Sequence, residues 1–178
     1  MQYEFGFIGV GNMGGALANA ACKALPAGKV AVCDTDDKKT AAFEKQYGAA
    51  VLPLDKITAS CRFLVLGVKP QVLPGVLSAI RPTLAESTVL VSMAAGISVS
   101  AIENAIPSKP VIRIMPNTPC SVGRGLILYA KNALVSDDDL SAFLAGVSKA
   151  GTLVPIAEDK IDAASAVSGC GPAFAYLF

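Results

Sequence analysis

Residues 9–14 read Gly-Val-Gly-Asn-Met-Gly, which places three glycines at the G-x-G-x-x-G spacing that binds the pyrophosphate of a dinucleotide. Gly9 permits a tight turn, Gly11 lets the backbone approach the pyrophosphate, and Gly14 allows a helix to pack closely on a strand. The amino terminus of such a helix adds partial positive charge beside the phosphates. An ordinary turn can also contain this pattern, so the predicted elements on either side of it must decide whether it is a dinucleotide site.

The context favours a dinucleotide site. A strand is predicted before the glycines and an Ala-rich helix after them, and a second predicted strand ends at Asp34. Asp34 lies 20 positions after Gly14, where a carboxylate can hold the hydroxyls of the adenosine ribose. The neighbouring acids Asp36 and Asp37 would repel a 2′-phosphate, whereas the two lysines at 38 and 39 could neutralise one or simply begin a solvated helix. The choice between NADH and NADPH therefore stays open.

Three further segments should meet the same ligand, because ligands of open α/β sheets lie outside the carboxyl ends of the strands. Residues 67–70 (Gly-Val-Lys-Pro), 94–96 (Ala-Ala-Gly) and 115–119 (Met-Pro-Asn-Thr-Pro) each follow or end an apolar run. They combine small residues with one amine and one amide. Lys69 stands directly after a buried strand and before proline, so we expect it at the rim of the cleft.

Strand and helix patterns alternate through residue 115, which predicts an α/β fold with a Rossmann-type, doubly wound and mostly parallel sheet. A further strand, a helix begun by Ser136 and a last strand should complete a domain of residues 1–157, and residues 158–178 should begin a helical domain that continues beyond the chain. The predicted strands are 5–9, 30–33, 50–52, 63–67, 88–92, 111–115, 126–130 and 152–156, and the predicted helices are 13–24, 38–47, 72–80, 98–105 and 136–150.

The composition narrows the possible functions. The 178 residues carry a net charge of +1 without basic clusters, so nucleic acid is not an expected partner. Mean hydropathy is +0.53, but the longest apolar runs are too short to span a bilayer, and the start has no basic secretory leader. Five scattered cysteines favour a reducing cytoplasm over a disulfide framework or a metal site. The absence of histidine excludes triads that depend on imidazole.

Five segments together resemble the pyrroline-5-carboxylate reductases in order and spacing: residues 7–14, 67–70, 92–96, 113–119 and 167–173. The resemblance implies reduction of the cyclic imine 1-pyrroline-5-carboxylate to proline by NADPH or NADH, and a homodimer or higher oligomer formed through the helical domain. It also implies a set of cofactor contacts and two substrate contacts. The expected cofactor contacts are Ile8, Gly9, Val10, Gly11, Asn12, Met13, Asp34, Asp36, Val68, Lys69, Pro70, Ala94, Ala95, Gly96 and Asn117, and the expected substrate contacts are Glu158 and Ser168.

Two features depart from the resemblance. Leu54 stands where the family often has an asparagine that contacts ribose, and the Ser/Thr-rich loop that holds the substrate carboxylate in relatives would lie beyond Phe178. Dinucleotide binding and imine reduction should therefore be separable in this chain. No catalytic residue is predicted, because a protonated imine accepts hydride without a strong base.

Two alternatives remain. A β-hydroxyacid dehydrogenase would need a lysine on the helix after residue 170, and residues 171–178 contain none. The other alternative is a dinucleotide-binding fragment without catalysis.

Overall fold

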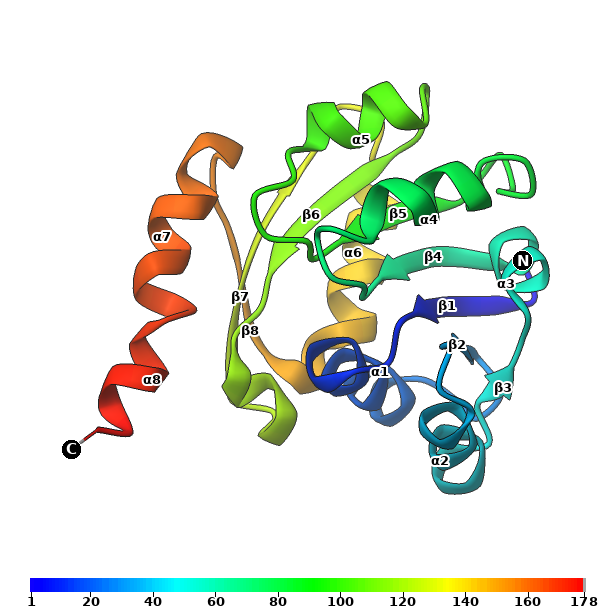
Figure 1. Ribbon diagram of the computed structural model, residues 1–178, viewed down its shortest axis with the longest axis horizontal. Helices are drawn as coiled ribbons and strands as arrows, with labels where there is room; N and C mark the ends of the chain where they lie inside the picture. Colours follow the sequence, from blue (N-terminus) through cyan, green and yellow to red (C-terminus); the bar gives the residue numbers. More distant parts are fainter. Residues whose placement is uncertain (178) are drawn as a thin grey trace.

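The computed structural model describes residues 1–177 and contains one eight-stranded sheet in the order β3-β2-β1-β4-β5-β6-β7-β8 (Figure 1). All pairs from β3 to β6 are parallel, β7 runs antiparallel to β6, and β8 is parallel to β7. This order is that of a doubly wound Rossmann-type sheet, which confirms the predicted fold class. The strands are β1 (Tyr3–Ile8), β2 (Val30–Cys33), β3 (Ala50–Val51), β4 (Cys61–Leu66), β5 (Val89–Ser92), β6 (Val111–Met115), β7 (Gly125–Lys131) and β8 (Gly151–Pro155).

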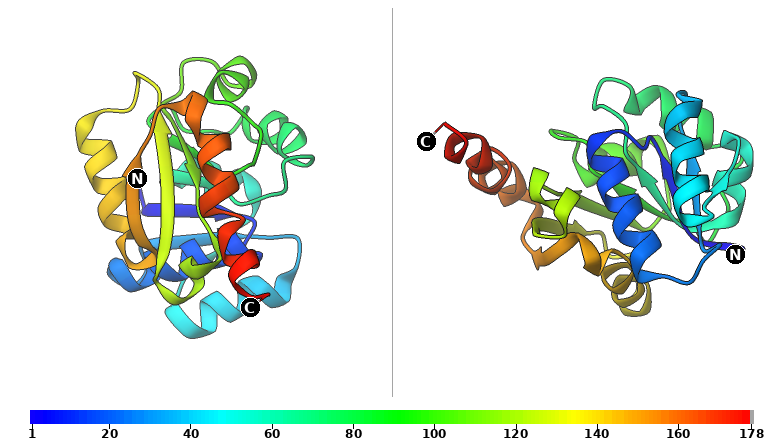
Figure 2. Two further views of the ribbon diagram at one scale, coloured as in Figure 1. Left: turned by 90° about the vertical axis from the view of Figure 1, so that its left-hand side faces the viewer. Right: turned by 90° about the horizontal axis from the view of Figure 1, so that it is seen from below.

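Helices cover both faces of the sheet, which explains why the central strands are apolar on both sides (Figure 2). Strand β1 contributes Phe5 and Phe7 to one hydrophobic core, beneath α1 and α6, and Ile8 to the other, beneath α3, α4 and α5. The helices are α1 (Asn12–Ala24), α2 (Asp37–Tyr47), α3 (Leu54–Ser60), α4 (Leu73–Ile80), α5 (Val99–Ala105), α6 (Asp137–Val147), α7 (Ile161–Ser168) and α8 (Gly171–Ala175), with 3₁₀ turns η1 (Thr118–Val122), η2 (Ser148–Ala150) and η3 (Glu158–Lys160).

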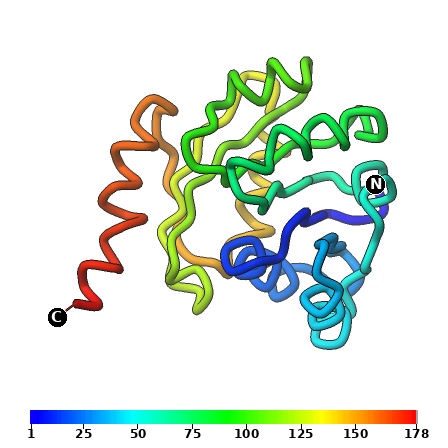
Figure 3. The backbone as a smooth tube through the Cα atoms, in the orientation of Figure 1, coloured from blue at the N-terminus to red at the C-terminus, as the bar shows by residue number. Residues whose placement is uncertain are grey.

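The antiparallel direction of β7 determines where α7 and α8 lie. Strand β8 starts at the sheet edge where β6 ends and runs away from it, because it is parallel to β7. Helix α7 then packs on β7, on the face opposite α6, and leads back toward that edge (Figures 1 and 2). The backbone trace shows α8 on the opposite side of the molecule from the amino terminus (Figure 3). The last helices therefore return to the edge at which β1, β4, β5 and β6 end.

The element boundaries follow the predictions closely, with three differences. Helix α3 and the turn η1 were not predicted, and the helix expected to reach Ala150 ends at Val147, where η2 tightens the last turn before β8. Seven residues of α3 are too few to display a clear helical period.

The predicted second domain starts with η3, α7 and α8, but its division from residues 1–157 stays a prediction. Helix α8 ends at Ala175, and Phe178, at the end of the helix predicted there, lies outside the described residues. Several apolar side chains on this part of the chain are exposed: Val167, Phe174, Tyr176 and Leu177. Within residues 1–177, no helix combines the length and hydrophobicity needed to cross a membrane.

Candidate functional site

The loop between β1 and α1 contains the three glycines, and the fold itself requires two of them. Gly9 has a φ of +88°, and a Cβ there would come within 2.8 Å of the Gly67 carbonyl oxygen. A Cβ on Gly14 would collide with the carbonyl oxygen of Gly9, because α1 crosses the end of β1 at close range. The turn and the helix–strand contact predicted for these two glycines are therefore present.

The fold does not require the third glycine. Gly11 has φ −67° and ψ −163°, an extended conformation open to any residue. A Cβ there would meet no other heavy atom of the described chain within 4 Å. As the N-cap of α1, Gly11 also offers no side chain to the first N–H groups of that helix, and the first turn of α1 holds no acid. The amino terminus of α1 is thus open to an anion.

A cleft of about 420 Å³ lies beside this loop, between the start of α1 and the ends of β4, β5 and β6. It contains five of the residues predicted individually as cofactor contacts and five others. Its lining residues are Gly11, Asn12, Met13, Val68 and Lys69, together with Gly14, Gly67, Met93, Met115 and Pro116. Within the second group, Gly14 belongs to the glycine motif, and Gly67, Met115 and Pro116 belong to the segments that were expected to meet the ligand. Met93 was not expected there, and its position directly after the predicted strand 88–92 was the available sequence signal.

Asp34 supports the glycine loop from the neighbouring strand. Its Oδ2 accepts a hydrogen bond of 2.8 Å from the backbone N–H of Val10, and its Oδ1 accepts one of 3.0 Å from that of Asp36. The side chain is 10% exposed, and Lys39 Nζ lies 4.0 Å from its Oδ1. Burial and the charge of Asp34 both raise the pKa of the adjacent Cys33 thiol, which therefore stays protonated at neutral pH.

The other predicted cofactor residues lie at the same edge but outside the cleft lining. Ala94 is buried, and its N–H donates to the Ser92 hydroxyl at 3.3 Å, whereas Ala95 is exposed and Gly96 occupies a turn with φ +72°. Pro70 follows Lys69 in the loop after β4. Their contacts with a cofactor stay predictions.

Asn117 and Ser168 join the loop after β6 to the end of α7. The Asn117 side-chain amide donates to the Ser168 carbonyl oxygen at 2.9 Å, and its Oδ1 accepts the N–H of Leu126 at 2.9 Å. The Ser168 hydroxyl donates to the carbonyl oxygen of Ala164 at 3.2 Å. The two residues expected to contact cofactor and substrate thus engage each other, and their described side-chain contacts are structural.

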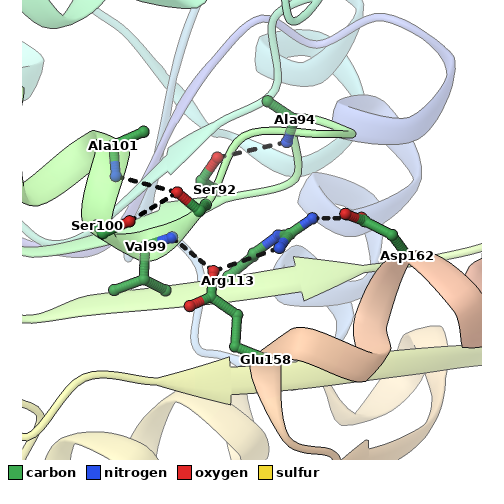
Figure 4. Close-up of polar contacts among 9 residues, drawn as sticks. Ser92, Ala94, Val99, Ser100, Ala101, Arg113, Glu158 and Asp162 are labelled. Atoms are coloured by element: carbon green, nitrogen blue, oxygen red, sulfur yellow. Dashed lines mark hydrogen bonds and ion pairs between the residues drawn. The ribbon is translucent and has the colours of Figure 1, made fainter.

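Glu158 likewise has protein partners. Its Oε1 accepts the N–H of Val99, at the start of α5, at 2.6 Å and lies 3.3 Å from Nη1 of Arg113 (Figure 4). Nη2 of Arg113 reaches Oδ1 of Asp162 at 2.5 Å. Arg113 is 4% exposed, and its Nε has no partner among residues 1–177. Glu158 therefore ties the start of α7 to β6 and α5, a role that the sequence did not indicate.

Comparisons with known proteins agree with this geometry. Residues 4–96 match the family described as "NADP oxidoreductase coenzyme F420-dependent". Pyrroline-5-carboxylate reductase from Synechocystis is 34% identical over 99% of the chain and 67% of its own length, and that from Pisum sativum is 30% identical over 99% and 65%. The crystal structure of Plasmodium falciparum pyrroline carboxylate reductase with NADP bound superposes with a TM-score of 0.87 at 30% identity, covering 100% of this chain and 67% of that one.

The chain spans about two thirds of the length of these relatives. The similarity covers the glycine loop, the strand ends that form the cleft and the segment through α7. The chain belongs to the pyrroline-5-carboxylate reductase family.

Proposed function

We propose that this protein binds NADPH or NADH in the cleft beside α1 and reduces 1-pyrroline-5-carboxylate to proline. The observation that carries the proposal is Gly11. Gly9 and Gly14 are explained by contacts within the protein, but Gly11 has an unstrained backbone and open space where its side chain would be. A glycine that the fold does not need, at the mouth of a cleft and at an uncapped helix start, fits close approach by a pyrophosphate.

The residues around the cleft suit a flat, partly apolar ligand. Gly67 follows β4 directly, and a Cβ there would collide with the Gly9 carbonyl oxygen. The backbone between the ends of β1 and β4 therefore carries no side chain at Gly67 that would project into the cleft. Met93 and Met115 supply flexible apolar walls, and Lys69 supplies one exposed cation at the rim. A dinucleotide could extend from Asp34, past the start of α1, toward these two methionines.

The dihydronicotinamide, when bound, supplies a hydride to the imine carbon. The protein contributes position: the backbone of residues 9–14 fixes the pyrophosphate, Asp34 holds the loop through Val10, and the strand ends orient the ring. The Asn117–Ser168 contact brings the end of α7 to the same edge of the sheet, where a small substrate would meet the cofactor. No proton-transferring side chain is needed, because the product amine retains the proton of the imine.

Two measurements test this proposal. Titration with NADH and with NADPH, followed by calorimetry, should give saturable binding of at least one of them. Absorbance at the wavelength of the reduced nicotinamide should fall when 1-pyrroline-5-carboxylate is added, with proline formed in equal amount. Loss of dinucleotide binding from a folded protein would reject the cleft assignment. Binding without proline formation by a protein that includes the expected loop for the substrate carboxylate would reject the assigned reaction.

We also propose a homodimer or higher oligomer, in the cytoplasm, with residues 158–178 as the start of the oligomerising domain. The exposed apolar side chains of Phe174, Tyr176 and Leu177 support this assembly, since such side chains on a soluble enzyme commonly mark an interface. The five cysteines are all free thiols, which suits a reducing compartment. If the assembly is wrong, sedimentation velocity of the protein with its complete helical domain would show a single monomeric species.

A further inference from the structure

We propose that this site prefers NADH to NADPH and that Asp34 sets the preference. The inference rests on the proposed function, since it concerns the adenosine end of the same dinucleotide. It selects between two cofactors that the proposed function leaves equivalent.

Asp34 lies where the adenosine ribose must pass. The carboxyl ends of β1 and β2 are adjacent, with Ile8 paired to Cys33, and the N–H of Gly9 donates to the Cys33 carbonyl oxygen at 2.8 Å. The glycine loop therefore starts alongside the last residue of β2. Asp34 follows at once and reaches the loop itself through the Val10 N–H at 2.8 Å. A dinucleotide whose pyrophosphate rests on Gly11 has its adenosine ribose beside this carboxylate.

The Asp34 carboxylate can still accept hydrogen bonds from a ligand. Each of its oxygens takes one backbone N–H, from Val10 and from Asp36, whereas a carboxylate offers about four acceptor positions in all. The free positions match the 2′- and 3′-hydroxyls of an unmodified ribose, which are donors. A 2′-phosphate replaces one of these donors with acceptor oxygens and about 1.5 to 2 negative charges. The same carboxylate that binds NADH should thus repel NADPH.

The cations nearby do not reverse this charge. Lys39 Nζ lies 4.0 Å from Asp34 and 3.6 Å from Asp36, so it already compensates carboxylates of the protein. Residues 34–39 contain three acids, two lysines and no arginine, the side chain that most often receives a 2′-phosphate.

The helix that starts here does not offer an anion site either. The carboxylate of Asp36 is the N-cap of α2 and accepts the N–H of Lys38 at 3.1 Å. A carboxylate of the protein therefore occupies the amino terminus of α2, where the helix dipole would stabilise a 2′-phosphate most.

The experiment compares equilibrium binding of the two reduced dinucleotides, followed by nicotinamide fluorescence and by calorimetry. For the wild-type protein, we expect NADH to bind more tightly than NADPH by on the order of tenfold. This is the effect expected when the Asp34 carboxylate repels a 2′-phosphate about 4 Å away. Asp34→Asn keeps the size of the side chain and one acceptor but removes the charge. It should weaken NADH binding and reduce the NADH-to-NADPH affinity ratio at least severalfold.

Asp138→Asn is the matched control. Asp138 is exposed in the first turn of α6, which follows the strand that runs toward the other edge of the sheet, so this change should leave the ratio unaltered. Wild-type protein that binds NADPH as tightly as NADH, or more tightly, would overturn the inference while leaving the proposed function intact. If the folded protein binds neither dinucleotide, both proposals fail. The wild-type ratio decides the question even if the Asp34 variant does not fold.

Discussion

Replacing Gly11 with valine should abolish tight dinucleotide binding without unfolding the protein. The extended backbone of Gly11 suits valine, and its Cβ would meet no other atom of the described chain within 4 Å. Because valine is a poorer N-cap than glycine, we expect the free energy of unfolding to fall by no more than about 1 kcal/mol. The added carbons fill space that the pyrophosphate needs. Overpacking of this kind costs about 2 kcal/mol, or roughly a 30-fold increase in Kd.

Calorimetric titration gives the Kd, and urea denaturation gives the free energy of unfolding. Gly14→Ala is the contrasting variant, because its Cβ would collide with the Gly9 carbonyl oxygen, and it should destabilise the fold by about 1–3 kcal/mol even without ligand. If Gly11→Val binds both dinucleotides with unchanged Kd, the space beside Gly11 is not where the pyrophosphate lies and the cleft assignment fails. A Gly11→Val protein that is itself unfolded would refute the claim that the fold tolerates a side chain there.

Three further predictions concern stability and thiol chemistry. Arg113→Met should lower the free energy of unfolding by about 1–3 kcal/mol in urea denaturation, because Glu158 and Asp162 lose their buried cation. A change below about 0.5 kcal/mol would refute a structural role for the ion pairs of Arg113 with these two acids. At pH 8 a disulfide reagent should modify the exposed Cys170 quickly and leave Cys22 and Cys61 protected. Burial raises the pKa values of Cys22 and Cys61 to about 11 and about 12, so both thiols stay protonated at this pH. Rapid labelling of Cys61 would contradict this. Stability should also decline as pH rises above about 9, because the unfolded thiols then lose protons that the folded protein retains, and thermal unfolding at pH 8 and pH 10 would detect the difference.

The sequence was sufficient to predict the sheet and the glycine loop, because both depend on local patterns. Continuous apolar runs identify strands buried on both faces, and the spacing of Gly9, Gly11 and Gly14 identifies a strand–helix turn. The sequence did not distinguish the reasons for the three glycines. Only the structure separates the two that the fold requires from Gly11, which it leaves free.

The contacts of the polar residues could not be predicted, because they join positions far apart in the chain. Arg113 meets Glu158 and Asp162 across 45 and 49 residues, and Asn117 meets Ser168 across 51. An arginine within an apolar strand was the one local sign that such partners must exist, since a buried cation needs a counter-charge. The expectations for Glu158 and Ser168 came from resemblance, which gives position along a chain but not the hydrogen bonds of a side chain.

The Arg113 cluster also has a consequence for how the protein forms during synthesis. Strand β6 emerges from the ribosome well before Glu158 and Asp162. The Arg113 guanidinium therefore has neither of its carboxylate partners at the stage when the parallel half of the sheet can already assemble. Burial of Arg113 before then would leave a cation without compensation, which opposes early completion of the β6 layer. We therefore expect the nascent chain to acquire its full protection against proteases only after α7 has been synthesised, as a late and cooperative step.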